Sequence, residues 1–229
     1  MRLTLPSGTP AEIAHPDPPE AARAGLRGPN APSGLVLLPD IMGLRPLFDG
    51  HCARLAAELG VVVVAPELFP GLEDQPLDWR LQHVGAVADT RRLGDIVDAA
   101  TATGHESVGI VGFCMGGMYA LKAAGTGRFT RAVSFYGIIR PPEAWRGEDS
   151  IEPLDAVTAE GACPVLELAG TADSFVPVAD LDALEAVGAT VVRYEGADHG
   201  FVHDDSRPTH RPDDAADAWA RARAFLNLA

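Results

Sequence analysis

The chain has 229 residues, and its 47% of apolar residues is enough to form one sizeable hydrophobic core. With 32 acidic and 18 basic residues, its formal net charge is −14, which argues against nucleic acid or an anionic membrane surface as a partner, because both bind clusters of Lys and Arg. The three cysteines, Cys52, Cys114 and Cys163, lie far apart without CxxC or CxxH spacing, so we expect neither disulfides nor a structural zinc.

The N-terminal residues predict a short β-hairpin, because residues 2–5 and 11–15 flank a turn that contains Pro and Gly. Residues 16–33 are rich in Pro, Ala and Gly and indicate a surface connection with one helical turn at residues 20–24. Further along, short apolar runs predict strands at residues 34–38, 61–65, 108–111, 132–136, 164–169 and 190–194.

Segments with helical spacing of apolar residues lie between most of these strands. They predict helices at residues 47–59, 79–102, 178–187 and 212–226, together with a helix after residue 114. Residues 138–162 indicate an irregular excursion. Strands that alternate with helices imply an α/β fold with a mostly parallel sheet covered on both faces, here a single domain over residues 1–229. Ligand chemistry in such sheets takes place at the C-terminal ends of the strands.

The most informative segment is GFCMGG at residues 112–117, which follows the apolar strand at residues 108–111. Glycines on both sides of Cys114 permit a tight turn from strand to helix. A side chain at the apex of such a turn projects out of the backbone above the N-terminus of the next helix. We therefore predict that Cys114 is a nucleophile on a nucleophile elbow, whereas Cys52 and Cys163 are typical of small buried residues.

Two other strand-end loops contain the groups that assist a nucleophilic thiol. Asp173 lies in GTADSFVP and His199 lies in GADHGF. The order nucleophile, acid, histidine is that of an α/β-hydrolase triad. In this interpretation His199 exchanges protons with Cys114, and Asp173 orients His199 and stabilises its charged form. The alternative is that Asp173 only caps a turn and that Asp198 is the acid.

The reactive form of the thiol and the binding of the developing oxyanion both need support from the backbone. A free thiol is only a few per cent ionised at neutral pH, and a helix N-terminus and an imidazole beside Cys114 both favour the thiolate. The oxyanion formed at a substrate carbonyl is expected to bind the backbone N–H groups of Met115 and of Ile41.

Six segments carry a resemblance to a known family: LPDIMG at 38–43, GFCMGG at 112–117, SFYG at 134–137, GTADSFVP at 170–177, DHGF at 198–201 and AA-x-AW at 215–219. With them the chain resembles the dienelactone hydrolase family of α/β-hydrolases over nearly its whole length. The resemblance implies an α/β-hydrolase fold, a triad of Cys114, Asp173 and His199, and hydrolysis of the enol lactone of carboxymethylenebutenolide.

Three positions are compared with further functional residues of that family. Asp40 stands where the family commonly has a Glu that takes part in activating the nucleophile, and it is one methylene shorter. His203 stands where the family enzyme has an arginine for the substrate carboxylate, and Arg80 is the nearest candidate for the other arginine. Asp40 as a turn former and His203 as a solvated loop residue, like Arg207, are the alternatives.

Aromatic residues complete the set of candidates. Tyr136, at a strand end, either lines the pocket or packs beneath it. The remaining candidates for the pocket walls are Trp79, Trp145 and Phe175.

The sequence as a whole predicts a hydrolase that cleaves a small-molecule ester or lactone through a thioester acyl-enzyme, without a cofactor or metal. We expect a monomer or small homo-oligomer in the cytoplasm, because no signal peptide or membrane-spanning segment is recognisable. Two alternatives remain: a thiol-based redox or sensor protein, which usually needs a resolving cysteine, and a catalytically silent binding module with the same fold.

Overall fold

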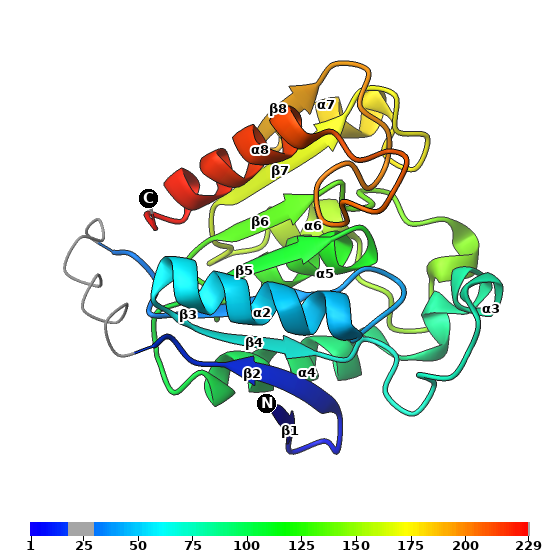
Figure 1. The fold of residues 1–229 in the computed structure, drawn as a ribbon. Helices are drawn as coiled ribbons and strands as arrows, with labels where there is room; N and C mark the ends of the chain where they lie inside the picture. Colours follow the sequence, from blue (N-terminus) through cyan, green and yellow to red (C-terminus); the bar gives the residue numbers. More distant parts are fainter. Residues whose placement is uncertain (18–29, 229) are drawn as a thin grey trace.

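A mostly parallel sheet forms the centre of the computed structural model, which describes residues 1–17 and 30–228 (Figure 1). Within this part of the chain the strand order is β1-β2-β4-β3-β5-β6-β7-β8. The strands are β1 (Arg2–Thr4), β2 (Pro10–Ala14), β3 (Gly34–Leu38), β4 (Val62–Pro66), β5 (Val108–Phe113), β6 (Ala132–Phe135), β7 (Val165–Gly170) and β8 (Thr190–Tyr194). Only β1 and β2 pair antiparallel with their neighbours. The predicted α/β fold with an N-terminal hairpin is therefore confirmed, and the predicted turn at residues 20–24 lies outside the described residues.

Helices cover both faces of the sheet. They are α2 (Pro46–Leu59), α3 (Leu77–Gln82), α4 (Asp89–Ala102), α5 (Met115–Ala124), α6 (Pro153–Val157), α7 (Val178–Ala186) and α8 (Pro212–Phe225), with short 3-10 turns η2 (Val84–Ala86) and η3 (Glu143–Trp145). In Figure 1, α2 and α8 lie in front of the sheet and α4 and α5 behind it. In the part of the chain that is described, no helix combines the length and the apolar character needed to cross a membrane.

The central strands are buried on both sides, as parallel strands between two helical layers must be. Every residue of β3, β5, β6 and β7 is buried. Their register places Leu38 of β3 opposite Gly112 of β5, and Phe113 opposite Phe135 of β6. The C-terminal ends of these strands therefore meet at one edge of the sheet, where the loops that contain the predicted site residues begin.

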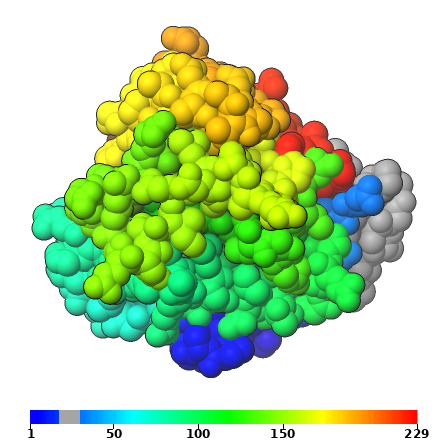
Figure 2. All heavy atoms as spheres, turned by 180° about the vertical axis from the view of Figure 1, so that it is seen from behind, coloured from blue at the N-terminus to red at the C-terminus, as the bar shows by residue number. Residues whose placement is uncertain are grey.

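The single long helix predicted at residues 79–102 is wrong, because the structure divides this segment into α3, η2 and α4. The Asp149 carboxylate accepts hydrogen bonds from the Asp89 N–H at 3.0 Å and the Thr90 N–H at 2.8 Å, and so caps a new helix N-terminus. Gly85 packs against the backbone there, since a β-carbon would lie 2.7 Å from the Arg146 carbonyl oxygen. Both partners come from the excursion after β6, which contains η3 and α6 and spreads over the reverse face in yellow-green (Figure 2).

A buried polar cluster joins α4 to α5, the helix that follows the elbow. Asp89 accepts hydrogen bonds from Lys122 Nζ at 2.7 Å and from the Tyr119 hydroxyl at 2.5 Å. The same carboxylate accepts the Ile151 N–H at 2.8 Å. Because the charges are paired and hydrogen-bonded, they can remain buried, and they fix α5 relative to α4 and to the excursion.

Candidate active site

Cys114 lies between the end of β5 and the start of α5, with φ 56° and ψ −118°. A positive φ is unfavourable for a residue with a β-carbon, so the surrounding backbone must hold this conformation. A β-carbon on Gly112 would lie 2.1 Å from the Gly116 carbonyl oxygen, and one on Gly116 would lie 2.3 Å from the Pro39 carbonyl oxygen. Only glycine fits at either position, and the close packing keeps Cys114 at the apex of the turn as predicted.

His199 and Asp173 follow β8 and β7 and are joined by a hydrogen bond of 2.7 Å from His199 Nδ1 to Asp173 Oδ2. The other oxygen of Asp173 accepts the N–H groups of Phe175 at 2.8 Å and Val176 at 3.3 Å, so the loop itself orients the carboxylate. Asp198, the alternative acid, instead accepts the backbone N–H of His199 at 2.7 Å. Of the two candidate acids, Asp173 is the one that contacts the imidazole.

The electrostatic environment favours a charged imidazole at His199. Burial alone would lower its pKa, but hydrogen bonds to Asp173 and to Cys114 outweigh burial and raise the pKa of His199 to about 10. A protonated imidazole beside the Cys114 sulfur can both stabilise a thiolate and later donate a proton.

A cavity of about 430 Å³ opens above Cys114 and His199. Its described lining residues include Ile41, whose N–H is one of the two predicted oxyanion donors. The other donor, the Met115 N–H, belongs to the first turn of α5, where backbone N–H groups have no acceptor within the helix. The remaining lining residues are Asp40, Leu77, Leu81, Trp145, Ser174, Phe175, Asp198, Arg207, Pro208 and Thr209.

Comparisons with known proteins show the family of the chain. The family model "Dienelactone hydrolase family" matches residues 22–229. The chain belongs to the dienelactone hydrolase family. It is 34% identical over 212 residues to the "Putative carboxymethylenebutenolidase" of Methylorubrum extorquens, covering 84% of this chain and 70% of that protein. It is 30% identical over 205 residues to the "Carboxymethylenebutenolidase" of Rhodococcus opacus, covering 84% and 79%.

A solved structure gives the same result. The structure titled "Putative Dienelactone Hydrolase from Klebsiella pneumoniae subsp. pneumoniae MGH 78578" matches with a TM-score of 0.81 at 25% identity, over 99% of this chain and 97% of that one. Membership of the dienelactone hydrolase family makes this protein a hydrolase of esters or lactones.

Asp40 and His203, two of the positions compared with functional residues of the family, are both buried and contact each other. Asp40 Oδ2 accepts His203 Nε2 at 2.8 Å, and the Tyr136 hydroxyl lies 2.6 Å from His203 Nδ1. A solvated His203 is therefore wrong, since the residue is only 2% exposed, and neither His203 nor Tyr136 lines the cavity above Cys114. The Tyr136 ring packs beneath the site, 5.1 Å from the ring of His199.

Arg80 is also absent from the cavity lining, so the structure does not support it as a ligand for a substrate carboxylate. Its guanidinium donates to backbone carbonyls of Glu73, of Gln75 at 2.9 Å and of Ile41 at 3.2 Å. These partners lie up to 39 residues away in sequence and could not be anticipated from the local pattern. The candidate wall residue Trp79 stacks on His83 at 4.2 Å and does not line the cavity, whereas Trp145 and Phe175 do.

Among the described residues of this dienelactone hydrolase family member, Arg207 is the arginine that lines the cavity. Its guanidinium packs over Gly200, where a β-carbon would lie 2.2 Å from Nη1, and Gly200 directly follows His199. Its pairing with Asp204 is loose, with 3.9 Å between Nε and Oδ2. Gly200 in DHGF is the sequence signal for this contact, because the missing side chain leaves room for the guanidinium beside His199.

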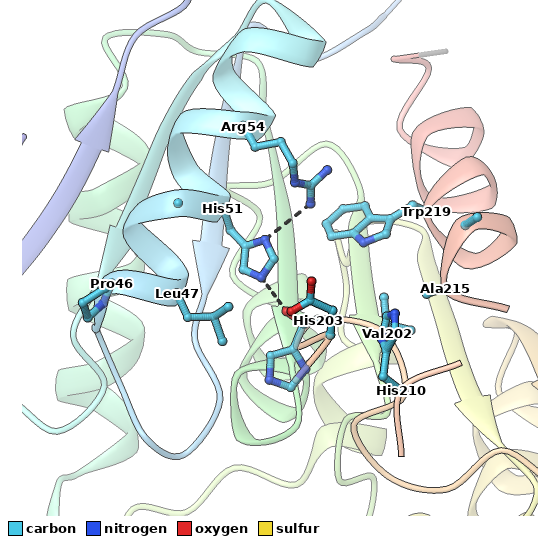
Figure 3. Close-up of a pocket in the computed structure, with 12 residues that line it drawn as sticks. Pro46, Leu47, His51, Arg54, Val202, His203, His210, Ala215 and Trp219 are labelled. Carbon is cyan, nitrogen blue, oxygen red and sulfur yellow. Dashed lines mark hydrogen bonds between the residues drawn. The ribbon is translucent and has the colours of Figure 1, made fainter. Parts of the chain in front are cut away.

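A second and more open cavity of about 520 Å³ lies between α2 and α8 (Figure 3). Its walls include His51, Arg54 and Trp219, and none of the three predicted triad residues lines it. His203 also borders this cavity, so its imidazole lies in the wall that separates the cavity from Asp40.

Proposed function

We propose that this hydrolase cleaves its ester or lactone through a thioester on Cys114, with His199 as the acid and base and Asp173 as the group that orients His199. The observation that carries the proposal is the position of Cys114 on a strained elbow, in one cavity with a histidine whose Nδ1 is bound by Asp173 at 2.7 Å. Thiolate, imidazole and carboxylate are the parts that nucleophilic acyl transfer needs.

In the first half-reaction the Cys114 sulfur attacks the carbonyl carbon, and its electron pair forms the C–S bond. The carbonyl oxygen becomes an oxyanion, for which the N–H groups of Met115 and Ile41 are the proposed donors. As the carbonyl re-forms, the C–O bond to the alcohol or enol breaks, and His199 donates its proton to that oxygen. A lactone ring opens in this step, so the leaving oxygen stays in the same molecule.

In the second half-reaction water attacks the thioester while His199 accepts a proton from it. Collapse of the second tetrahedral intermediate breaks the C–S bond and returns the sulfur as a thiolate beside protonated His199. Asp173 keeps the imidazole in one orientation through both steps, because its own position is set by the Phe175 and Val176 N–H groups.

For the substrate we propose a lactone that carries a carboxylate, bound by Arg207. Two of the relatives carry the name carboxymethylenebutenolidase, after a lactone with a carboxylate on its side chain. Arg207 supports the same class here, because a loosely paired guanidinium beside His199 is suited to a carboxylate. With a net charge of −14, the protein needs such a local cation to hold an anionic substrate.

A redox or sensor role is less well supported, because such a thiol usually needs a second cysteine that can form a disulfide with it. Cys52 and Cys163 are both buried. Burial raises the pKa of Cys52 to about 12 and that of Cys163 to about 11, so both remain protonated thiols at neutral pH.

The test is turnover of carboxylate-bearing enol lactones, simple lactones and activated esters by wild type and by Cys114→Ala. Cys163→Ala is the matched control, because it also removes one thiol, but from a buried position outside the cavity. We expect loss of hydrolysis only in Cys114→Ala, with both variants folded by circular dichroism. Undiminished turnover by Cys114→Ala would contradict the proposal.

A further inference from the structure

We infer that Asp40 is a positioning residue that fixes the backbone around Ile41, held in place by His203 and Arg45, and that it does not activate Cys114 directly. Residues 39–44, which lie in the connection between β3 and α2, are called the oxyanion loop. The inference rests on the proposed function, because the oxyanion loop matters only where a carbonyl is attacked. It gives Asp40 and His203 a task that differs from thiol activation and from substrate binding.

The Asp40 carboxylate is fully occupied by hydrogen-bond donors. Oδ1 accepts the Met42 N–H at 2.9 Å and Arg45 Nη1 at 2.6 Å. Oδ2 accepts Arg45 Nη2 at 2.8 Å and His203 Nε2 at 2.8 Å. A carboxylate offers about four lone-pair directions, and four donors already fill them. Asp40 therefore has no lone pair left to accept a proton from Cys114.

The charge of Asp40 is also neutralised where it stands. Burial alone would raise the pKa of Asp40, but the hydrogen bonds from His203 and Arg45, together with the charge of Arg45, hold it well below its usual range. The bidentate guanidinium of Arg45 gives the pair a fixed geometry, and Arg45 precedes the first turn of α2. The carboxylate is thus an anchored anion across the whole physiological pH range.

His203 is itself fixed at both its ring and its backbone. Its Nε2–H donates to Asp40, so Nδ1 must accept the hydrogen of the Tyr136 hydroxyl at 2.6 Å. The carbonyl of His203 lies 2.7 Å from His51 Nε2, and Figure 3 shows the His51 imidazole reaching from α2 toward that backbone. Burial lowers the pKa of His203, in keeping with this neutral form. His203 is therefore a rigid donor, supported from α2 and from the end of β6.

The oxyanion loop is held at successive peptide groups. The Asp40 carbonyl, which shares a peptide with the Ile41 N–H, accepts the Gly43 N–H at 2.9 Å. In the next peptide, Asp40 Oδ1 accepts the Met42 N–H, and the Ile41 carbonyl accepts Arg80 Nη1 at 3.2 Å. The peptide that presents the proposed oxyanion donor is thus fixed directly and through its neighbour.

Glu67, at the end of β4, fixes the far end of the same loop. Its Oε2 accepts the Leu44 N–H at 2.8 Å, and Gly43 has φ 70° with the Glu67 carboxylate packed where a β-carbon would lie. Hydrogen bonds to Asp40, Arg80 and Glu67 therefore hold the oxyanion loop in place. Loss of one of these hydrogen bonds is expected to displace the Ile41 N–H, and a displacement of about 1 Å costs on the order of 100-fold in rate.

Anchoring and activation can be separated by the chemistry applied to Cys114. Hydrolysis of p-nitrophenyl acetate passes through an oxyanion and needs the loop. Alkylation by iodoacetamide is a displacement at a saturated carbon, forms no oxyanion and needs only the thiolate. If Asp40 anchors the oxyanion loop, its substitution slows hydrolysis and leaves alkylation unchanged. If Asp40 activates the thiol, its substitution slows both reactions.

The principal variant is Asp40→Asn. It keeps the size of the side chain but places an amide NH2, which cannot accept a hydrogen bond, where a carboxylate oxygen accepts donors. We expect kcat for p-nitrophenyl acetate to fall by about 10–100-fold with little change in KM. The rate of Cys114 alkylation should stay within about twofold of wild type. A parallel loss of alkylation, or an unchanged kcat, would overturn the inference.

His203 provides an independent second variant if Asp40→Asn does not fold. His203→Ala removes the donor and should lower kcat with alkylation preserved, whereas the amide of His203→Gln can still donate and should restore part of kcat. Equal kcat in both variants and wild type would contradict the inference. Asp95→Asn is the matched control, because Asp95 is a buried acid that accepts Ser7 and Thr9 hydroxyls outside the cavity. It should lower stability without lowering kcat.

The two hypotheses fail in different ways. Turnover by Cys114→Ala would reject the proposed function whatever Asp40 does. An inactive Cys114→Ala together with an unaffected Asp40→Asn would reject only the anchoring role.

Discussion

Glu167 lies on β7, completely buried beneath the site, and its carboxyl group determines how stability changes with pH. Its Oε1 accepts the Gly137 N–H at 3.0 Å. Burial raises the pKa of Glu167 from 4.5 to about 8, against the opposing influence of the Ser134 hydroxyl and the Gly137 N–H. At neutral pH the folded protein therefore keeps a proton that the unfolded chain has released.

The sign of the effect follows from this proton. Because the unfolded state binds fewer protons than the folded state between these two pKa values, the free energy of unfolding decreases as pH rises through that interval. Each pH unit well inside this interval contributes ~1.4 kcal/mol, and the contribution is smaller close to either pKa. Ionisation of Glu167 therefore lowers the free energy of unfolding by about 3–4 kcal/mol between pH 5 and pH 8.

Glu167→Gln removes the ionisation and keeps the shape and the acceptor for Gly137. Urea unfolding of both proteins at pH 5 and pH 8 measures the effect, and the difference between them cancels the contributions of all other groups. We expect the difference in free energy of unfolding between the variant and wild type to increase by about 3–4 kcal/mol, in favour of the variant, from pH 5 to pH 8. An identical pH dependence for the two proteins would refute the reasoning.

Three further predictions follow from the structure. Asp149→Ala removes the cap of α4 and should lower the free energy of unfolding by ~1 kcal/mol in urea, with kcat for a neutral ester unchanged. Arg207→Gln should raise KM for a carboxylate-bearing lactone by about 5–30-fold, since a charge-assisted hydrogen bond at a partly exposed guanidinium contributes ~1–2 kcal/mol, and KM for p-nitrophenyl acetate should not change. Asp173→Asn should lower kcat by roughly 100-fold or more and, by lowering the pKa of His199, shift the alkaline limb of the pH–rate profile to lower pH; an unshifted limb would contradict the assigned partner.

The sheet and the meeting of Cys114, Asp173 and His199 could be predicted because they depend on local patterns. Apolar runs separated by helical spacing predict parallel strands, and parallel strands bring their C-terminal ends to one edge. Close approach of the backbone at the elbow requires glycine at positions 112 and 116, so these two residues indicate the turn directly in the sequence.

The features that sequence reasoning missed depend on partners far away in the chain. The helix predicted over residues 79–102 is interrupted because Asp149, about 60 residues later, caps Asp89 and Thr90. The loop context of His203 predicts a solvated residue, but Asp40, 163 residues earlier in the chain, makes it a buried donor. Arginine commonly binds carboxylates, which makes Arg80 a candidate from the sequence. Only the fold shows that its guanidinium already donates to backbone carbonyls.

The central claim is that Cys114 forms a covalent thioester during hydrolysis. Mixing the enzyme with a p-nitrophenyl ester, quenching in acid within one turnover and measuring intact and peptide masses tests it most directly. We expect one acyl group on the peptide that contains Cys114 in wild type, and none in Cys114→Ala, which should release no product. An acyl group on a different residue, or hydrolysis by Cys114→Ala at the wild-type rate, would contradict it.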